Sequence, residues 1–85
     1  MSAFFVVQSF TRGDRGGLRP DIPVQAQNTN HARRMAERLS QSKALVVAFT
    51  REGDASTGEF GEAMLITALG DVPDEVREMP AAAAG

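Results

Sequence analysis

The chain has 85 residues, a formal net charge of −2 and no cysteine. This length makes one domain that buries only about 60–65% of the surface its unfolded form exposes, so association would stabilise it. The absence of cysteine excludes disulfides, a thiol nucleophile and thiolate metal sites.

No segment resembles a targeting signal or a membrane span. The apolar stretch 3–7 has about five residues and no preceding positive charge, whereas a secretory signal needs roughly 7–15 apolar residues after a basic segment. No apolar run approaches the ~20 residues of a transmembrane helix. We therefore expect a cytoplasmic protein without a membrane partner.

The charges are divided unevenly between the two parts of the chain. Residues 1–51 carry +5 and residues 52–85 carry −7. The simpler interpretation is that the two parts attract each other, within one chain or across a dimer. The alternative is a basic surface for nucleic acid.

The N-terminal part of the chain predicts a strand, a turn and a ragged edge strand. Residues 3–10 are rich in Phe and Val, with Phe4, Val6 and Phe10 on one face. Residues 12–17 hold three glycines and predict a turn. Residues 18–25 contain Pro20 and Pro23, so they suit only a sheet edge; a plain loop is the alternative.

A long helix is expected over Asn28–Gln41. Its apolar stripe has the helical spacing i, i+3, i+4, i+7 and consists of Ala32, Met35, Ala36 and Leu39. Asn28 is the preferred N-cap, with Thr29 and Asn30 as alternatives.

The rest of the chain predicts two more strands and a short helical turn. Residues 44–50 and 62–69 have strong strand character and are separated by a polar loop, 51–61. A helical turn is expected from Pro73. Residues 1–80 would form the domain, and the Ala-rich residues 81–85 would form a disordered tail.

These elements predict an α+β fold: a small, mostly antiparallel sheet of three to four strands with one long helix packed on one face. The order is strand, ragged strand, helix, strand, strand. Because the strands are apolar on both faces and one helix covers only one, we expect a homodimer to cover the rest. The sequence assigns no particular residues to the dimer face.

The sequence offers no catalytic, cofactor-binding or metal site, and we expect no enzyme activity and no cofactor. His31 is the single histidine, and a hydroxyl nucleophile would need a base and an orienting group. The loop from Asp54 has Gly58 at its fifth position, where a calcium loop needs glycine at the sixth, and has Leu65 at the twelfth in place of the bidentate Glu. Residues 13–17 match neither the dinucleotide-binding nor the P-loop pattern.

Arg33, Arg34 and Arg38 on the outer side of the expected helix form the candidate partner-contact surface. With Lys43, they could neutralise phosphates. Against nucleic acid stand the acidic composition and the positions of Phe4 and Phe5, which point to opposite faces and cannot stack two bases together.

Four stretches resemble a group of short bacterial proteins of similar length that has no assigned function: FVVQSF, NHARRMAERL, VVAFTREGD and TGE. The resemblance covers about residues 4–73 and implies a free-standing protein, but no site. The strand–helix–strand–strand order also resembles half of a ferredoxin-like fold, which implies no activity.

The sequence therefore favours a small non-enzymatic protein-interaction or regulatory protein that acts as a homodimer, with a further protein partner as an option. The alternatives are weak nucleic-acid binding through the basic helix face and small-ligand binding in a dimer groove.

Overall fold

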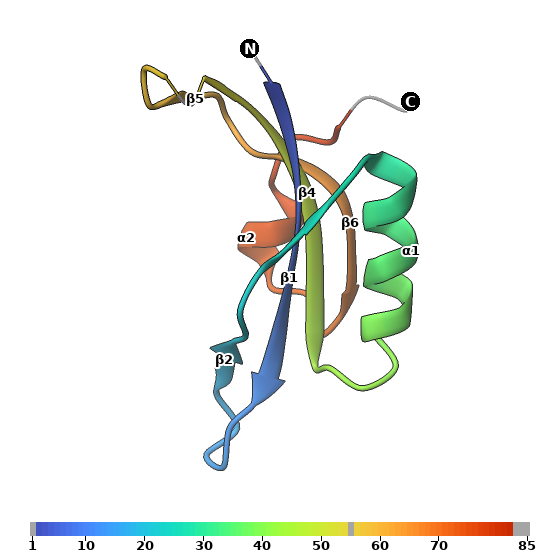
Figure 1. The fold of residues 1–85 in the computed structure, drawn as a ribbon. Coiled ribbons are helices and arrows are strands. Elements are labelled where there is room, and N and C mark those ends of the chain that lie inside the picture. Colours follow the sequence, from blue (N-terminus) through green and yellow to red (C-terminus); the bar gives the residue numbers. More distant parts are fainter. Residues whose placement is uncertain (1, 55, 83–85) are drawn as a thin grey trace.

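A computed structural model describes residues 2–54 and 56–82 and shows a mostly β protein (Figure 1). In chain order the elements are β1 (Ser2–Arg12), β2 (Leu18–Pro20), β3 (Val24–Ala26), α1 (Thr29–Leu39), β4 (Leu45–Asp54), β5 (Glu59–Phe60), β6 (Met64–Gly70) and α2 (Asp74–Arg77).

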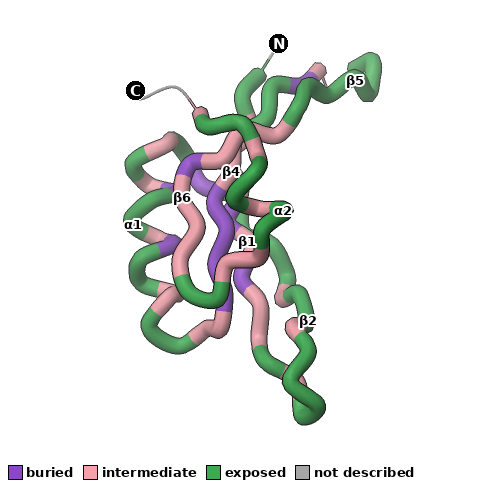
Figure 2. The backbone as a smooth tube through the Cα atoms, turned by 180° about the vertical axis from the view of Figure 1, so that it is seen from behind, coloured by how far each residue is buried: buried purple, intermediate pink, exposed green. Residues whose placement is uncertain are grey.

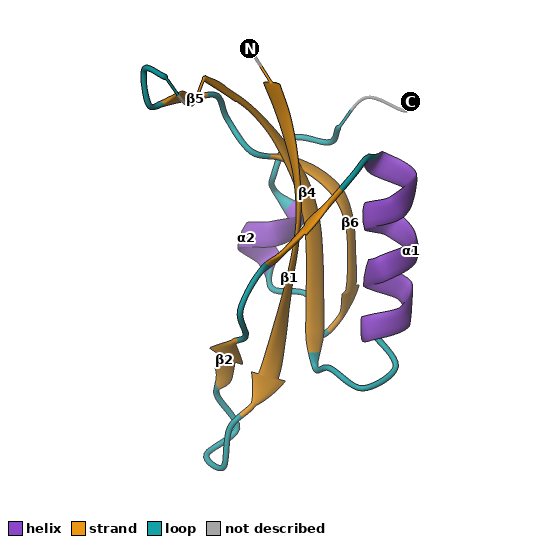
Figure 3. Ribbon diagram, viewed as in Figure 1, coloured by secondary structure: helices purple, strands orange, loops and turns teal. Residues whose placement is uncertain are grey.

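The strands form one curled antiparallel sheet (Figure 3). β1 and β4 lie in the middle and pair from Ser2↔Gly53 to Phe10↔Leu45. β2 and β3 pair with the outer side of β1, while β5 and β6 pair with the outer side of β4. The sheet therefore has a β2–β3 edge and a β5–β6 edge.

The expected α+β fold built around one long helix is wrong. α1 has 11 residues and ends at Leu39, where the chain turns back with backbone hydrogen bonds from Ser40 N to Ala36 O and from Lys43 N to Leu39 O. The strands are longer than expected, because residues 51–54 of the predicted polar loop pair with β1 and β5. Strand, and not helix, is therefore the main secondary structure.

Several local predictions are confirmed. The Asn28 side chain caps α1 by accepting from the His31 backbone N–H at 2.8 Å. Residues 18–26 form the ragged edge, with a break between Pro20 and Val24 where neither β2 nor β3 continues. Proline has no N–H to donate, which suits this edge position.

One face of the sheet packs against α1. Ala32 and Ala36 are fully buried there, together with Val7, Val46, Ala48 and Ile66 in the core cluster. Met35 and Leu39 flank this cluster, so the apolar stripe faces the sheet as predicted. Small alanines let the helix backbone lie close to the sheet, and Figure 2 shows the buried residues concentrated along the central strands.

The second face is covered at one end by the C-terminal segment. α2 lies on the opposite side of the sheet from α1 (Figure 1) and contacts β6. At this end Leu45 and Val47 are only 2% and 6% exposed. Leu65 N–H donates to Pro80 O, and Ala82 N–H donates to Leu65 O. Residues 81 and 82 of the expected tail thus lie along β6, and residues 83–85 lie outside the described residues.

Candidate functional site

The three predicted contact arginines lie together on the outward side of α1. Arg33, Arg34 and Arg38 are all exposed, and none forms an ion pair with residues 2–54 or 56–82. Arg34 and Arg38 are four positions apart and share a helix face, and Arg33 is the exposed neighbour of Arg34. They remain available to an external anion.

Lys43 does not join this basic surface. Its ammonium lies 3.3 Å from Asp21 Oδ2, in a cluster where the Ser9 and Thr11 hydroxyls also donate to the Asp21 carboxylate at 3.0 Å. Ser9 is only 5% exposed, so this bond satisfies a buried hydroxyl. The cluster attaches the break between β2 and β3 to β1 and to the loop after α1.

The same contacts explain the ionisation of Asp21. Partial desolvation raises the pKa of the Asp21 carboxyl, but the hydrogen bonds from Ser9 and Thr11 and the nearby Lys43 charge outweigh it. The pKa therefore lies below its ordinary value. All the donors of this carboxylate belong to elements that it holds together, so we interpret Asp21 as structural.

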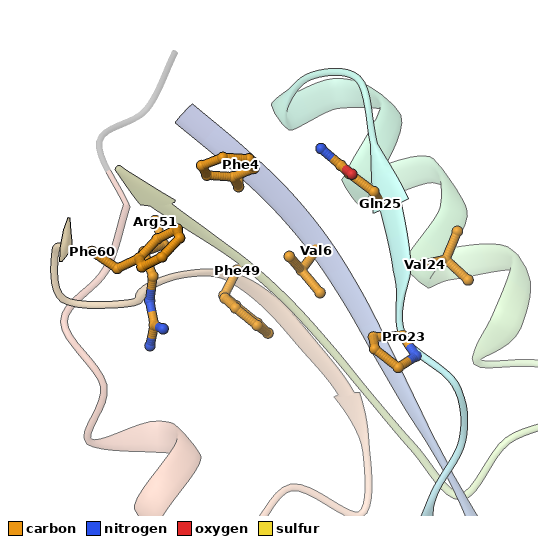
Figure 4. A pocket seen from close by; sticks show the side chains of 8 residues that line it. All are labelled: Phe4, Val6, Pro23, Val24, Gln25, Phe49, Arg51 and Phe60. Atoms are coloured by element: carbon orange, nitrogen blue, oxygen red, sulfur yellow. The ribbon is translucent and has the colours of Figure 1, made fainter. Parts of the chain in front are cut away.

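A hollow of about 510 Å³ opens on the part of the second sheet face that α2 leaves uncovered. Its volume falls within the range of small-molecule sites, about 300–1,000 Å³. Figure 4 shows side chains from β1, β4, β5 and the β3 edge around it. The lining residues are Phe4, Val6, Pro23, Val24, Gln25, Phe49, Arg51 and Phe60.

Strand register explains the floor of this hollow. Val6 pairs with Phe49, and Phe4 pairs with Arg51, so these four side chains project from the same face of the two central strands. Phe5 is the neighbour of Phe4 and packs against the opposite core under α1. The aromatic residues of the hollow thus come from different strands.

The Phe60 ring fits at one end of the hollow because residue 53 is a glycine. Phe60 pairs with Gly53 across β4 and β5, and a Cβ atom on Gly53 would overlap the Phe60 ring. The ring therefore lies over the bare glycine, with its centroid 5.8 Å from that of Phe4 and the two planes inclined by 52°. This tilted geometry is a favourable arrangement of two aromatic rings. Phe60 nevertheless remains 52% exposed.

Among the described residues, Arg51 is the one charged residue that lines the hollow, and Gln25 is the other lining side chain with hydrogen-bonding groups. Arg51 is exposed and forms no ion pair within the described ranges, 2–54 and 56–82. Sequence reasoning missed this site because it placed Arg51 and Phe60 in a polar loop. Extending the strand alternation of Val47 and Phe49 by one step would have placed Arg51 beside Phe49.

The remaining polar candidates have structural partners. His31 Nδ1 accepts from the Gln27 backbone N–H at 3.0 Å, beside the helix cap. Asp54 Oδ1 accepts from the Ser56 hydroxyl at 2.7 Å and from the Ser56 N–H, and these bonds lower the Asp54 pKa. Among the described residues, no group of three or more His, Asp or Glu side chains is placed to hold a metal ion.

No protein-family model matches the chain, and comparisons with curated proteins and with solved structures gave no significant match. Within the described part of the chain, no helix has the length and apolar character needed to cross a membrane.

Proposed function

We propose that this chain is a small non-enzymatic interaction protein that acts as a homodimer, and that two copies join through the outer edge of β6. The observation that carries the proposal is the difference between the two edges of the sheet. An exposed strand edge presents unpaired N–H and C=O groups that readily pair with another strand.

The β2–β3 edge has the features that prevent such pairing. Pro20 and Pro23 lack the backbone donor, Arg19 is exposed, and the edge is interrupted between its two short strands. Charges, prolines and short interrupted strands are the usual means of protecting a sheet edge. We infer that this side of the sheet stays free of a second strand.

The β6 edge has none of these features. The strand MLITALG contains no charged residue and no proline. Within the described ranges, β6 forms two further sets of hydrogen bonds besides its pairing with β4: Leu65 bonds to Pro80 and Ala82, and Gly70 O accepts from the Val72 N–H. A stretch of four residues, 66–69, is therefore left to pair with a second copy.

Antiparallel pairing of β6 with its own copy satisfies these groups around a twofold axis. The axis would stand perpendicular to the sheet, so the two sheets would continue into one and both α1 helices would lie on the same face. Arg33, Arg34 and Arg38 of the two copies would then form one larger basic surface for an acidic protein partner.

Sedimentation equilibrium with a β6 variant tests this proposal. The wild type should be dimeric at about 100 μM. Thr67→Lys should be largely monomeric, because each copy would bring a lysine to the shared edge, where like charges repel. Thr57→Lys in the β4–β5 hairpin adds the same charge away from that edge and should remain dimeric. A monomeric wild type, or a dimer unaffected by Thr67→Lys, would overturn the proposed edge.

The exposed arginines of α1 support weak nucleic-acid binding as a second candidate function, because none of the three is neutralised by a residue in the described ranges. Mobility of random DNA and RNA at about 50 mM salt tests it. Retention should disappear after Arg33→Glu, Arg34→Glu and Arg38→Glu are combined, while dimerisation should persist. Unchanged mobility with the wild type would exclude this second function.

A further inference from the structure

We propose that the hollow on the second sheet face binds a small apolar monocarboxylate. The apolar body would lie on Phe4, Val6, Phe49 and Phe60, and the carboxylate would bind the Arg51 guanidinium. This site is separate from the proposed dimer edge on β6, so it does not rest on the dimer proposal.

The apolar part of the ligand follows from the lining. Phe4, Val6 and Phe49 are only half-buried, although they project from the central strands of the sheet. Central-strand residues of a small sheet are normally covered, as Leu45 and Val47 are at the other end of the same face. Burying the aromatic rings against a flat apolar group would remove this exposed surface from water.

The charge of the ligand follows from Arg51. Arg51 stands directly opposite Phe4 in the β1–β4 register, and Figure 4 shows its side chain among those that line the hollow. A guanidinium can hold a carboxylate through two parallel hydrogen bonds. Because no acidic residue of the described part of the chain lines the hollow, a ligand carboxylate would meet no like charge from these residues.

The same charge disfavours a second copy of the chain as the occupant. Packing two hollows face to face across a twofold axis would bring the Arg51 residues of both copies into one desolvated contact. Like charges at such a contact are unfavourable. Charge complementarity therefore favours an anion over self-association at this face.

A neighbouring hollow on the helix side of the same strands lacks this selectivity. It is lined by Arg51, Glu52 and Glu62, among others, and so presents both signs of charge. Its lining by described residues includes Phe5 and Met64 but no pair of facing aromatic rings. The hollow with Phe4 and Phe60 is therefore the better match for an apolar anion.

Nuclear magnetic resonance titration with two probes tests this site. The probes are 2-naphthoate and its neutral analogue 2-naphthamide, which share the flat apolar body. Naphthoate should bind the wild type with a dissociation constant of about 1 mM and shift the amides of Phe4, Val6 and Phe49. Naphthamide should bind about five- to tenfold more weakly, because it cannot form the charge-assisted pair.

Matched variants separate the contributions of charge and apolar surface. Arg51→Gln should weaken naphthoate binding to the naphthamide level and leave naphthamide binding unchanged, whereas Arg34→Gln on α1 should change neither. Phe60→Ala should weaken both probes. Retained amide dispersion in the free variants shows that each is folded.

Four results would overturn the site. The first is equal affinity of the wild type for both probes, and the second is a response confined to amides of α1. The third is no saturable binding up to about 10 mM naphthoate. Shifts of the Phe4 and Phe49 amides with protein concentration alone would show that a second copy occupies the hollow, which also contradicts the proposal.

Discussion

Replacing Gly70 by alanine should strongly destabilise the protein, because this glycine lies at the end of β6 in close contact with the start of β4. Gly70 has a φ of +96°, and a Cβ atom there would overlap the carbonyl oxygen of Ala44. Ala44 cannot easily move, since its N–H donates to Phe10 O at 3.0 Å and its oxygen accepts from Asp71 N–H at 2.9 Å.

The free energy of unfolding that Gly70→Ala loses has two sources. A left-handed conformation costs a non-glycine residue roughly 1–2 kcal/mol, partly offset by about 0.4–1 kcal/mol from the less flexible unfolded chain. Overlap with a fixed carbonyl adds about 1–3 kcal/mol, as overpacking does in cores. The expected loss for Gly70→Ala is about 2–4 kcal/mol.

Gly16→Ala is the matched control. Gly16 has a φ of +84°, and no atom of residues 2–54 or 56–82 lies within 4 Å of a Cβ added there. It should lose only about 1 kcal/mol, or roughly 4–8 °C in Tm. Gly70→Ala should lose at least twice as much in thermal unfolding at the same protein concentration. Equal losses for both variants would refute the close approach of Gly70 to Ala44 and the β4–β6 register.

Three further predictions concern separate parts of the fold. The pKa of the Asp21 carboxyl lies below its unfolded value of 3.8, so its contribution to stability is present above that pH and is lost as the pH falls through the folded pKa. Denaturant titrations should show that Asp21→Asn loses less stability in acid than the wild type does. An identical loss of stability in acid would contradict the cluster around Asp21. Val76→Asp, on the half-buried side of α2, should reduce stability by about 1–3 kcal/mol, measured by urea unfolding; no loss would mean that α2 does not pack on the sheet. Gly53→Ala should displace the Phe60 ring and reduce naphthoate binding by about the same factor as Phe60→Ala, and unchanged binding would show that the ring does not depend on the glycine.

Much of the secondary structure could be predicted from local patterns. The stripe from Ala32 to Leu39 and the Asn28 cap defined the face and the start of α1, because both depend on residues close in sequence. The prolines at positions 20 and 23 likewise defined a poor edge strand. Each of these features is confirmed in the structure.

The overall class and the hollow could not be predicted in this way, since they depend on pairing between distant segments. Arg51 and Gly53 belong to a strand because β1 and β5 supply partners for a polar stretch that has no strand pattern of its own. The cover over one end of the second sheet face depends on where α2 docks against β6, which Val76 and Met79 alone did not reveal. The hollow forms because β4 extends as far as Arg51 and Gly53 and because α2 leaves that end of the sheet face uncovered.

Amide hydrogen exchange along β6, followed as protein concentration rises, tests the proposed dimer most directly. Some amides of residues 66–69 should exchange rapidly at about 10 μM and become protected at about 1 mM, because antiparallel pairing with a second β6 gives them partners. The same amides in Thr67→Lys should stay unprotected. Exchange along β6 that does not depend on concentration, with new protection at Phe60 instead, would contradict an edge-paired dimer.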